Sequence, residues 1–458
     1  MNAQQILLED KTMKSFITDG FVTVDADMPA GFHQSLYEQI DGVFESEGNP
    51  GNNILPRVPD IARILSHPRV AGALSSILGP DYHLHAHRHC HFRPPHSDGQ
   101  RLHKDSWSRR HHRTRWCMLF YYPQDTTAEM GPTEVVPGSQ YYNRTPGPDV
   151  GEEIPLCGGP GTVTVVHYDL WHRGGANTCD RKRYMLKFLI TRMAEPLGPT
   201  WDGGESEWEA EPDRRTGMWA STWRWHRGVA NGGETGSEGE DSGSDRNDLI
   251  RRLSDEDETT CFEAAYALAA AGEVAVPGLI DVLAAEDEAT RRNAVYALAA
   301  VGTAAVPALA DTLAAGTPAS RAMAAEALGE MGLQAEAAVP ELGAALRDAD
   351  PELRKSAAYA LGSLGSSARA AVPALIDAVG AADEWVRRNA PLTLARLGPD
   401  AEEAVAPLVK LLSDESRYVQ ANAANAMARI GSADSLAALI SYLSTARWCS
   451  ITTNTTPY

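Results

Sequence analysis

The sequence predicts two different folds in one chain: a two-sheet β jelly roll (a double-stranded β-helix) with a helical cover, followed by an all-α solenoid. Three observations predict this division. The 458 residues exceed what one ordinary hydrophobic core accommodates. All 14 histidines and most aromatic residues fall within residues 1–227, whereas residues 248–448 are rich in Ala, Leu and Val. Short segments separated by Gly and Pro in the first part give way to regularly recurring helices in the second.

The N-terminal region predicts the helical cover. Gly20 ends the first helix, and the turn Gly79-Pro80 closes the region before the main strands begin. The predicted elements, in order, are a short amphipathic helix within residues 8–22, a strand at 21–24, a helix across 33–45, a polar loop at 48–56 and a helical segment across 60–78.

The strands of the jelly roll are predicted from short apolar runs bounded by turn residues. They are residues 82–92, residues 116–122, the Val135-Val136 pair, residues 159–166 and residues 184–191. Many short strands of this kind, with helices confined mostly to the start, are typical of a two-sheet jelly roll.

Five histidines alternate with other residues in the first of these strands, namely His83, His85, His87, His89 and His91. In a regular strand they would share one face, which either lines a polar pocket or lies partly exposed. We expect His89 and His91 to face inward, because the segment ends just before the residues discussed next.

The pair His103 and Asp105 is the centre of the functional prediction. Residues i and i+2 of an extended strand point to the same side, so both can bind one metal ion. A third ligand must come from another strand; His172 is the best candidate and His167 its rival. Two imidazoles and one carboxylate on one side of an ion leave the other side open, as in non-haem Fe(II) oxygenases.

A basic segment at residues 109–115 follows this pair in an otherwise acidic protein. It is interpreted either as a receptor for an anionic substrate group near the metal or as a solvated loop, which is the usual place of a charge run.

Glycines and prolines recur at a fixed spacing in the second half. The glycines, each closing a helix, are Gly272, Gly302, Gly332, Gly365, Gly398 and Gly431, and the prolines, each near the start of the next helix, are Pro277, Pro307, Pro340, Pro373 and Pro407. A proline is tolerated there because its missing N–H would have no helical partner. Each unit is therefore two short helices, and about six units must stack to bury their Ala and Leu faces.

These units resemble HEAT repeats, in particular the short phycobilisome-lyase-like type. The resemblance rests on Ala-Val-Pro-x-Leu, then Asp or Glu, then Arg-Arg-Asn-Ala as at Arg291–Ala294 and Arg387–Ala390, then Ala-Leu-x-x-x-Gly. It implies a solenoid that binds a protein partner or acts as a spacer.

The first domain resembles the phytanoyl-CoA dioxygenase family of cupin-like Fe(II)/2-oxoglutarate oxygenases. The residues that carry the likeness are Leu102-His103-Lys104-Asp105, Met130-Gly131-Pro132, Val136-Pro137-Gly138-Ser139-Gln140, Trp171-His172-Arg173-Gly174-Gly175-Ala176-Asn177 and Arg183. Gln140 departs from the family, which usually has His there.

The resemblance implies a set of cofactors and their ligands. Fe(II) is expected on His103, Asp105 and His172, with 2-oxoglutarate and O2 in the open positions. Arg183, eleven residues after His172, matches the family's 2-oxoglutarate arginine, and Arg181 is its rival. A guanidinium suits this role because it binds a carboxylate through two parallel hydrogen bonds. We also expect His91 to be a cofactor-binding residue.

The predicted domains follow from these assignments. They are a dioxygenase domain at residues 1–227, an acidic Gly/Ser-rich flexible linker at 228–247, a HEAT solenoid at 248–448 and a C-terminal tail at 449–458.

The predicted function is Fe(II)- and 2-oxoglutarate-dependent hydroxylation of a small-molecule or carrier-bound substrate, with the solenoid binding a protein partner or recruiting substrate. Asp105 favours hydroxylation over halogenation, because halogenating relatives lack this carboxylate. One alternative is a HEAT-repeat adaptor that carries a non-catalytic barrel. Another is a metal enzyme that does not use 2-oxoglutarate and would not need Arg183.

Charge and cysteine content set the expected surroundings. A net charge of −20 argues against binding nucleic acid or anionic membranes. The start of the chain shows no basic segment followed by an apolar run, so we expect no signal peptide, no membrane span and a cytoplasmic location. The six cysteines form no Cys-x-x-Cys pair, which predicts reduced thiols rather than a disulfide framework or a zinc ribbon.

Overall fold

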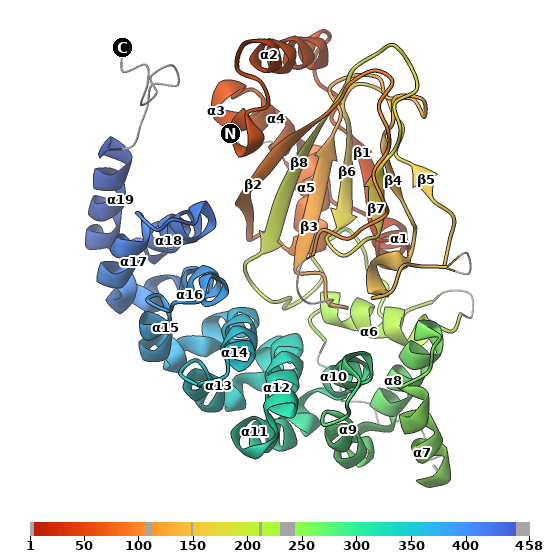
Figure 1. The fold of residues 1–458 in the computed structure, drawn as a ribbon, viewed down its shortest axis with the longest axis vertical. Coiled ribbons are helices and arrows are strands. Elements are labelled where there is room, and N and C mark those ends of the chain that lie inside the picture. The colour runs from red at the N-terminus through yellow and green to blue at the C-terminus, as the bar shows by residue number, and fades with distance from the viewer. Residues whose placement is uncertain (1–3, 107–111, 148–149, 210–212, 230–242, 446–458) are drawn as a thin grey trace. The chain divides into compact units, whose positions relative to one another are not determined.

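The computed structural model describes residues 4–106, 112–147, 150–209, 213–229 and 243–445. The chain divides into two compact units, Met1–Ala304 and Ala305–Tyr458. The first unit contains the β-sheets, their helical cover and the first helices of the repeat region, and the second contains the remaining repeats (Figure 1).

Two antiparallel sheets form the jelly roll. The five-stranded sheet has the order β1-β6-β3-β8-β2 and the three-stranded sheet the order β5-β4-β7. The strands are β1 (Phe21–Asp25), β2 (Tyr82–Arg93), β3 (Trp116–Tyr121), β4 (Thr133–Val135), β5 (Ile154–Pro155), β6 (Thr162–His167), β7 (His172–Gly174) and β8 (Arg183–Arg192). The predicted fold class is therefore confirmed.

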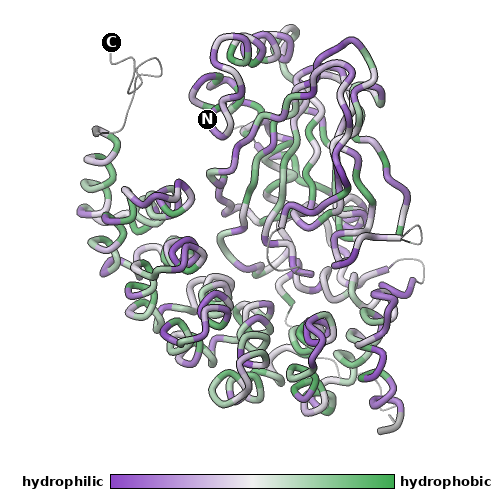
Figure 2. The backbone as a smooth tube through the Cα atoms, in the orientation of Figure 1, coloured by the Kyte–Doolittle hydropathy of each residue, from purple (hydrophilic) through white to green (hydrophobic). Residues whose placement is uncertain are grey.

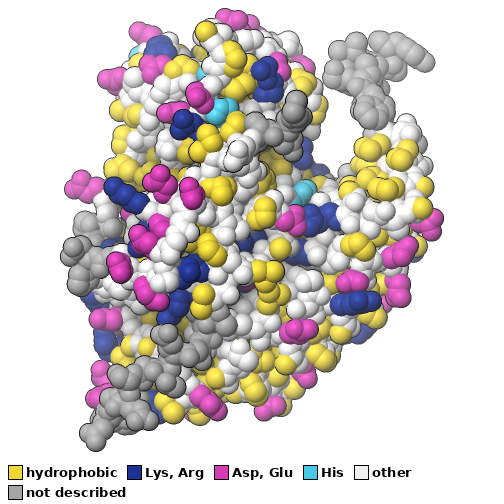
Figure 3. All heavy atoms as spheres, turned by 180° about the vertical axis from the view of Figure 1, so that it is seen from behind, with side chains coloured by type: hydrophobic (Ala, Val, Ile, Leu, Met, Phe, Trp, Pro, Cys, Tyr) yellow, Lys and Arg dark blue, Asp and Glu magenta, His cyan; other side chains and the backbone are white. Residues whose placement is uncertain are grey.

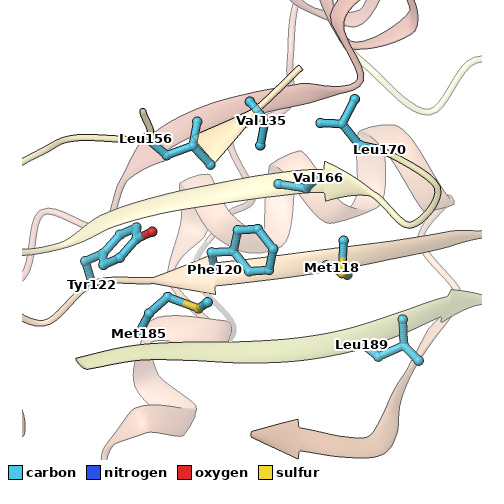
Figure 4. Close-up of a cluster of buried hydrophobic side chains, with 9 residues drawn as sticks. All are labelled: Met118, Phe120, Tyr122, Val135, Leu156, Val166, Leu170, Met185 and Leu189. Atoms are coloured by element: carbon cyan, nitrogen blue, oxygen red, sulfur yellow. The ribbon is translucent and has the colours of Figure 1, made fainter. Parts of the chain in front are cut away.

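The core between the sheets is built by alternate residues of the strands (Figure 4). On β3, Met118 and Phe120 point toward the second sheet, and Met185 and Leu189 do so from the neighbouring β8. Each such large apolar side chain contributes about 1.5–3 kcal/mol on burial. Odd-numbered residues of β8 therefore face the interior of the jelly roll, which decides where its polar residues point.

Helices cover the other face of the five-stranded sheet (Figure 1). They include α1 (Asp10–Asp19), α2 (Phe32–Glu47) and α5 (Pro68–Leu78). Every residue of α5 from Val70 to Leu78 is buried, because the helix packs on β1, β2 and β6 on one side and under the N-terminal segment on the other. Gly72 permits the second contact, since a Cβ there would lie 1.8 Å from the Ile6 carbonyl oxygen.

Three local predictions need correction. The loop at residues 48–56 contains a 3-10 turn η1 (Gly51–Asn53) and the start of α3 (Ile54–Arg57). The helical segment at 60–78 is two helices, α4 (Ile61–Leu65) and α5, because a residue before proline avoids the α conformation and His67 is extended before Pro68. Helix α6 (Thr216–His226) was not predicted, because its tryptophans are buried on several sides rather than on one stripe.

The repeats are confirmed as helix pairs. The described helices are α7 (Gly243–Arg252), α8 (Glu258–Ala271), α9 (Val276–Val282), α10 (Glu288–Val301), α11 (Val306–Ala315), α12 (Pro318–Met331), α13 (Val339–Ala345), α14 (Pro351–Leu364), α15 (Val372–Ala378), α16 (Glu384–Leu397), α17 (Val405–Leu411), α18 (Arg417–Ile430) and α19 (Ala433–Thr445). Short 3-10 turns join the helices of most pairs. They are η3 (Gly272–Ala275), η4 (Gly302–Ala305), η5 (Gly332–Ala338), η6 (Gly365–Ala371) and η7 (Gly398–Ala404). All six predicted glycines have positive φ and directly follow a helix. Apolar residues make up much of the repeat helices, together with polar ones, as Figure 2 shows.

The predicted linker and tail lie largely outside the described residues, which omit 230–242 and 446–458. Helix α7 begins at Gly243, before the predicted end of the linker. The predicted domain boundaries stay predictions.

Two stretches, Glu258–Val282 and Glu288–Ala315, are long and apolar enough to cross a membrane by length and composition alone. Each consists of two helices of a repeat, interrupted at Gly272 or Gly302 where φ is positive. Of the most apolar window, 33% is buried in the first stretch and 56% in the second, where helices of neighbouring repeats pack on it.

On the face seen in Figure 3, basic side chains are mixed with acidic ones. Among the described residues, charged side chains form exposed ion pairs, such as Arg347 with Asp377. Such exposed pairs contribute at most about 1 kcal/mol each.

Candidate active site

His103 and His172 are direct neighbours across two antiparallel segments. The backbone N–H of each histidine donates to the carbonyl oxygen of the other, at 2.9 Å in both directions. His172 is the first residue of β7, and the segment carrying His103 runs alongside, with Gln100 hydrogen-bonded to Gly174. The two imidazole rings meet with centroids 4.6 Å apart.

Asp105 completes the group. Its Oδ2 lies 3.4 Å from His172 Nε2, and its Oδ1 lies 4.0 Å from His103 Nε2. One ligand atom from each of the three residues falls within 4.8 Å of the other two, and within the described part of the chain no other such group of His, Cys, Asp and Glu occurs. Geometry therefore brings together the three side chains that the sequence analysis selected.

The prediction that His103 and Asp105 share a regular strand is wrong. His103 forms one isolated bridge, and Asp105 lies in a bend. Side-chain contacts pull this segment out of the sheet: Lys104 Nζ donates to the Gln140 carbonyl at 3.0 Å, and Ser106 Oγ donates to the carboxylate of Asp169. The two ligands converge through these contacts rather than through strand alternation.

The hydrogen bonds of both histidines prepare Nε2 for a metal. Nδ1 of His103 lies 2.8 Å from the Arg101 carbonyl, and Nδ1 of His172 lies 2.9 Å from the Leu170 carbonyl. A carbonyl oxygen can only accept, so Nδ1 carries the proton in each ring and Nε2 can offer its lone pair. The donor set, two imidazole nitrogens and one carboxylate on one side, fits Fe(II).

The Pro-Gly-Ser turn holds the start of β7 in place. Ser139 Oγ accepts a hydrogen bond from the Trp171 N–H at 3.1 Å, and Trp171 Nε1 donates to the Tyr142 carbonyl at 3.0 Å. Trp171 immediately precedes His172, so these bonds fix the ligand's backbone. Gln140 donates to the Ile17 carbonyl at 2.9 Å and thereby anchors the end of α1.

Arg183, the first residue of β8, is 2% exposed and reaches the site from the opposite sheet. One of its nitrogens, Nη2, donates to the Gly131 carbonyl, and its guanidinium lies 5.9 Å from the centre of the Tyr122 ring. Nε and Nη1 are buried and have no hydrogen-bond partner among the described residues. Burial, the largest influence, lowers the pKa of Arg183 from its usual value. A buried donor pair of this kind suits a carboxylate of 2-oxoglutarate.

The register of β2 and β8 places polar residues of both strands on the interior face. His89 pairs with Lys187 and His91 with Met185, so both histidines share the inward face of the odd-numbered β8 residues. The expectation for these two is thus confirmed by the pairing. His85 and His87 fall in a bulge between Leu84 and Arg88, where simple alternation does not apply.

His91 is held neutral at this position. Burial, followed by the charges of Lys187, His89 and Arg183, lowers its pKa to about 2. Its Nε2 is buried and has no hydrogen-bond partner among the described residues. A neutral imidazole beside Arg183 can exchange a hydrogen bond with a bound co-substrate.

Lys187 is a residue that the sequence analysis did not select. It is 6% exposed, and its ammonium donates to Asp105 Oδ2. Burial, the largest influence, raises the pKa of Asp105, but the neighbouring His172 and the charge of Lys187 outweigh it and hold that pKa below its usual value. The signal was present in the sequence, because Lys187 follows Arg183 by four residues and so shares its face of the strand.

The rival residues lie elsewhere. His167, at the end of β6, packs on Phe16, and its Nδ1 accepts the Asp169 N–H at 3.1 Å. Arg181 is exposed and lies 3.8 Å from the exposed carboxylate of Asp125. His167 therefore does not belong to the group formed by His103, Asp105 and His172, and Arg181 is not buried as Arg183 is.

In the described part of the basic segment, two arginines are buried and bind partners within the fold. Arg115 is buried and makes two hydrogen bonds to Glu195, at 2.7 and 3.1 Å. Arg113 is buried and donates to the Ser221 carbonyl at 2.9 Å. The anion-binding interpretation is therefore wrong for these two arginines, whose charges are used by the fold. Residues 109–111 lie outside the described part.

Comparison with protein families matches residues 40–185 to phytanoyl-CoA dioxygenase (PhyH). HEAT repeats match residues 306–390, 339–411 and 372–449, and the PBS lyase HEAT-like repeat matches residues 290–314. None of the curated proteins compared with this chain matches it.

Several solved structures are similar in fold to the first part of the chain. The non-heme alpha ketoglutarate dependent epimerase SnoN from nogalamycin biosynthesis is 17% identical over 40% of this chain and 83% of its own, with a TM-score of 0.35. EctD from S. alaskensis, with 2-oxoglutarate and 5-hydroxyectoine, is 17% identical over 42% of this chain and 78% of its own, with a TM-score of 0.37. The carbocyclase SnoK, also from nogalamycin biosynthesis, is 16% identical over 43% and 88%, with a TM-score of 0.35.

The family match covers both ligand segments, and the three candidate iron ligands converge within it. Residues 40–185 therefore belong to the phytanoyl-CoA dioxygenase family of Fe(II)- and 2-oxoglutarate-dependent oxygenases, and HEAT repeats follow them in the chain.

Proposed function

We propose that this protein hydroxylates an organic substrate, using Fe(II), 2-oxoglutarate and O2. His103, Asp105 and His172 hold the metal, and Arg183 and His91 bind the co-substrate. The observation that carries the proposal is the convergence of two imidazoles and one carboxylate, with one ligand atom of each within 4.8 Å of the other two. Bound iron supplies the redox chemistry by which O2 converts a C–H bond to C–OH while 2-oxoglutarate becomes succinate and CO2.

The residues of the chain have distinct tasks in this reaction. Arg183 holds the far carboxylate of 2-oxoglutarate, so that the keto acid reaches the metal in one orientation. The backbone pairing of His103 and His172 keeps the ligand distance constant when substrate enters. The presence of Asp105 supports hydroxylation rather than halogenation, because the carboxylate occupies the position that chloride would need.

The test compares two histidines on neighbouring segments. His172→Gln should abolish binding of one equivalent of Fe(II) in anaerobic dialysis, whereas His167→Gln should retain it. With O2, the wild-type protein should convert 2-oxoglutarate to succinate, measured by mass spectrometry across a broad substrate panel. Equal metal binding by the two variants would remove the proposal.

The proposal also assigns a role to the HEAT repeats and a cellular location to the enzyme. The HEAT solenoid binds a protein partner or recruits a carrier-bound substrate, and the enzyme acts in the cytoplasm. Affinity capture with residues 248–448 and fractionation of the cells that make the protein test these two statements. The alternative, an adaptor with a non-catalytic barrel, predicts a partner for the repeats but no succinate formation under any condition.

A further inference from the structure

Lys187 lies where a lysine is hardest to accommodate. It is 6% exposed, and its inward-facing neighbours along β8, Met185 and Leu189, belong to the apolar core. Lysine is almost never fully buried unless its charge is paired. Among the described residues, the recorded partner of its ammonium is Asp105, which is itself a candidate metal ligand.

This pairing leaves a charge imbalance once metal is bound. The ammonium and the metal ion then share one carboxylate, and Arg183 adds a further buried positive charge. His91 and the Nδ1-protonated ligand histidines add no negative charge. Before any co-substrate binds, the positive charges of Fe(II), Lys187 and Arg183 exceed the negative charge of Asp105 by three. Because Lys187 is 6% exposed and Arg183 2% exposed, such an excess is strongly unfavourable unless anions neutralise it.

We propose that Lys187 forms an anion subsite beside the metal position that binds a carboxylate. This inference rests on the proposed function, because it takes the metal to lie on His103, Asp105 and His172. The carboxylate comes either from 2-oxoglutarate or from the substrate. In the second case the substrate is an organic acid, oxidised at a carbon near its carboxylate.

The subsite has a consequence for the metal itself. Without an anion, the ammonium repels a divalent ion and competes with it for Asp105. With an anion in place, the repulsion is cancelled. Lys187 therefore couples metal binding to carboxylate binding, so that each should strengthen the other.

The experiment compares Lys187→Met with Lys182→Met. Lys182 precedes the same strand and also pairs with an aspartate, Asp41, away from the site, which makes it a matched control. Calorimetric titration with Co(II), without 2-oxoglutarate, should show at least tenfold tighter binding by Lys187→Met and unchanged binding by Lys182→Met. Lys187→Gln, examined alongside by circular dichroism, serves if the methionine variant does not fold.

Two further measurements identify the source of the carboxylate. If 2-oxoglutarate supplies it, the affinity of the Co(II)-loaded protein for 2-oxoglutarate should fall at least tenfold in Lys187→Met. If the substrate supplies it, 2-oxoglutarate affinity should not change, and the Co(II)–2-oxoglutarate protein should enhance the relaxation of acetate methyl protons in the wild type but not in Lys187→Met. Metal, 2-oxoglutarate and acetate binding that are all identical in the Lys187 and Lys182 variants would overturn the subsite.

These outcomes separate the subsite from the proposed function. Wild-type protein that binds neither Co(II) nor 2-oxoglutarate, or binds them equally after His172→Gln, contradicts the metal centre itself. Normal wild-type binding together with unchanged Lys187 variants contradicts the subsite alone.

Discussion

Arg183 shows how a single residue can be built for a ligand. Its guanidinium is enclosed by Tyr122, Gly131 and the strand itself, and two of its nitrogens are left without partners among the described residues. A hydrogen bond to a charged group is worth about 1.5–3 kcal/mol, so leaving these donors unused weakens the fold. The arrangement is consistent with selection for binding rather than for stability.

Replacing Arg183 by Gln should therefore separate binding from folding. We expect 2-oxoglutarate affinity to fall roughly 100-fold, because two charge-assisted hydrogen bonds are lost, while metal affinity stays unchanged. Calorimetry with the Co(II)-loaded protein measures both. The matched variant is Arg181→Gln, an exposed arginine two residues away, which should bind 2-oxoglutarate normally. Full activity of Arg183→Gln would favour a metal enzyme that does not use 2-oxoglutarate.

At the same scale, the sequence selected the three side chains that converge in the structure, because a two-residue spacing and a downstream histidine carry the pattern. The role of Arg183 in binding 2-oxoglutarate stays a prediction. Lys187 was not selected. A lone lysine in a strand is normally read as exposed, so its four-residue spacing from Arg183 was not used, and the strand register confirms that both residues share the interior face. The partners of Arg113 and Arg115 were also hidden, since Glu195 and Ser221 lie far from them in sequence.

At the scale of elements, the loop Met130-Gly131-Pro132 links the two sheets at the site. Gly131 has φ 64°, and a Cβ there would lie 2.5 Å from the Gly175 carbonyl oxygen. Its own carbonyl accepts a hydrogen bond from Arg183. The close approach of the backbones at Gly131 and Gly175 thus fixes the position of the carbonyl that accepts the hydrogen bond from Arg183.

Gly131→Ala should destabilise the protein and weaken co-substrate binding together. We expect a loss of about 2 kcal/mol or more in the free energy of unfolding, from the positive φ and the clash with the neighbouring backbone. Urea unfolding and 2-oxoglutarate titration check this. At Gly147 a Cβ would meet nothing within 4 Å and φ is not positive, so Gly147→Ala should leave both quantities unchanged.

Helix α6 carries a buried histidine that should make the fold sensitive to acid. His226 is 1% exposed, and burial, followed by the charges of Arg192 and Arg113, lowers its pKa well below the usual value. The unfolded chain takes up a proton below about pH 6.5, whereas the folded chain does not. Stability is therefore full above that pH and falls as the pH decreases, by up to about 1.4 kcal/mol per pH unit.

Urea unfolding at pH 7.5, 6.5 and 5.5 tests this. The free energy of unfolding should decline over this range in the wild type and more gently in His226→Gln. His96, on an exposed loop, provides the comparison, and His96→Asn should keep the wild-type slope. Parallel declines in all three proteins would contradict the assignment to His226.

Local rules predicted the elements that depend on neighbouring residues. Gly20, with φ 84°, ends α1 as expected, and each recurring glycine of the repeats follows a helix. Elements fixed by distant contacts were not predictable. The Trp-rich helix α6 and the single bridge at His103 depend on partners elsewhere in the fold.

At the scale of the whole molecule, the first repeat helices belong to the same compact unit as the jelly roll. His112 lies on Tyr296 of α10 with ring centroids 3.8 Å apart, and its Nδ1 is 2.7 Å from the Tyr266 hydroxyl of α8. The carboxylate of Glu258 accepts the N–H groups of residues 143 and 144 at 2.9 Å. These contacts fix the position of His112, which follows Asp105 by seven residues in the sequence.

Tyr296→Ala should therefore increase local opening of the oxygenase domain around His112. We expect faster amide hydrogen exchange at residues 112–116, because about 1 kcal/mol or more of aromatic packing is lost. Mass spectrometry of peptides measures it. The control is Tyr359→Ala in α14, whose hydroxyl contacts Glu330 within the second unit and which should leave exchange at residues 112–116 unchanged.

The glycine-to-proline junctions of the repeats are nearly interchangeable from one pair to the next. Because a stacked array is stabilised between neighbours, whole modules beyond Ala305 can be added or deleted in register without disturbing the chemistry at the other end of the chain. The number of these modules is thus a variable that can change separately from the residues of the candidate iron site, which lie in the first unit.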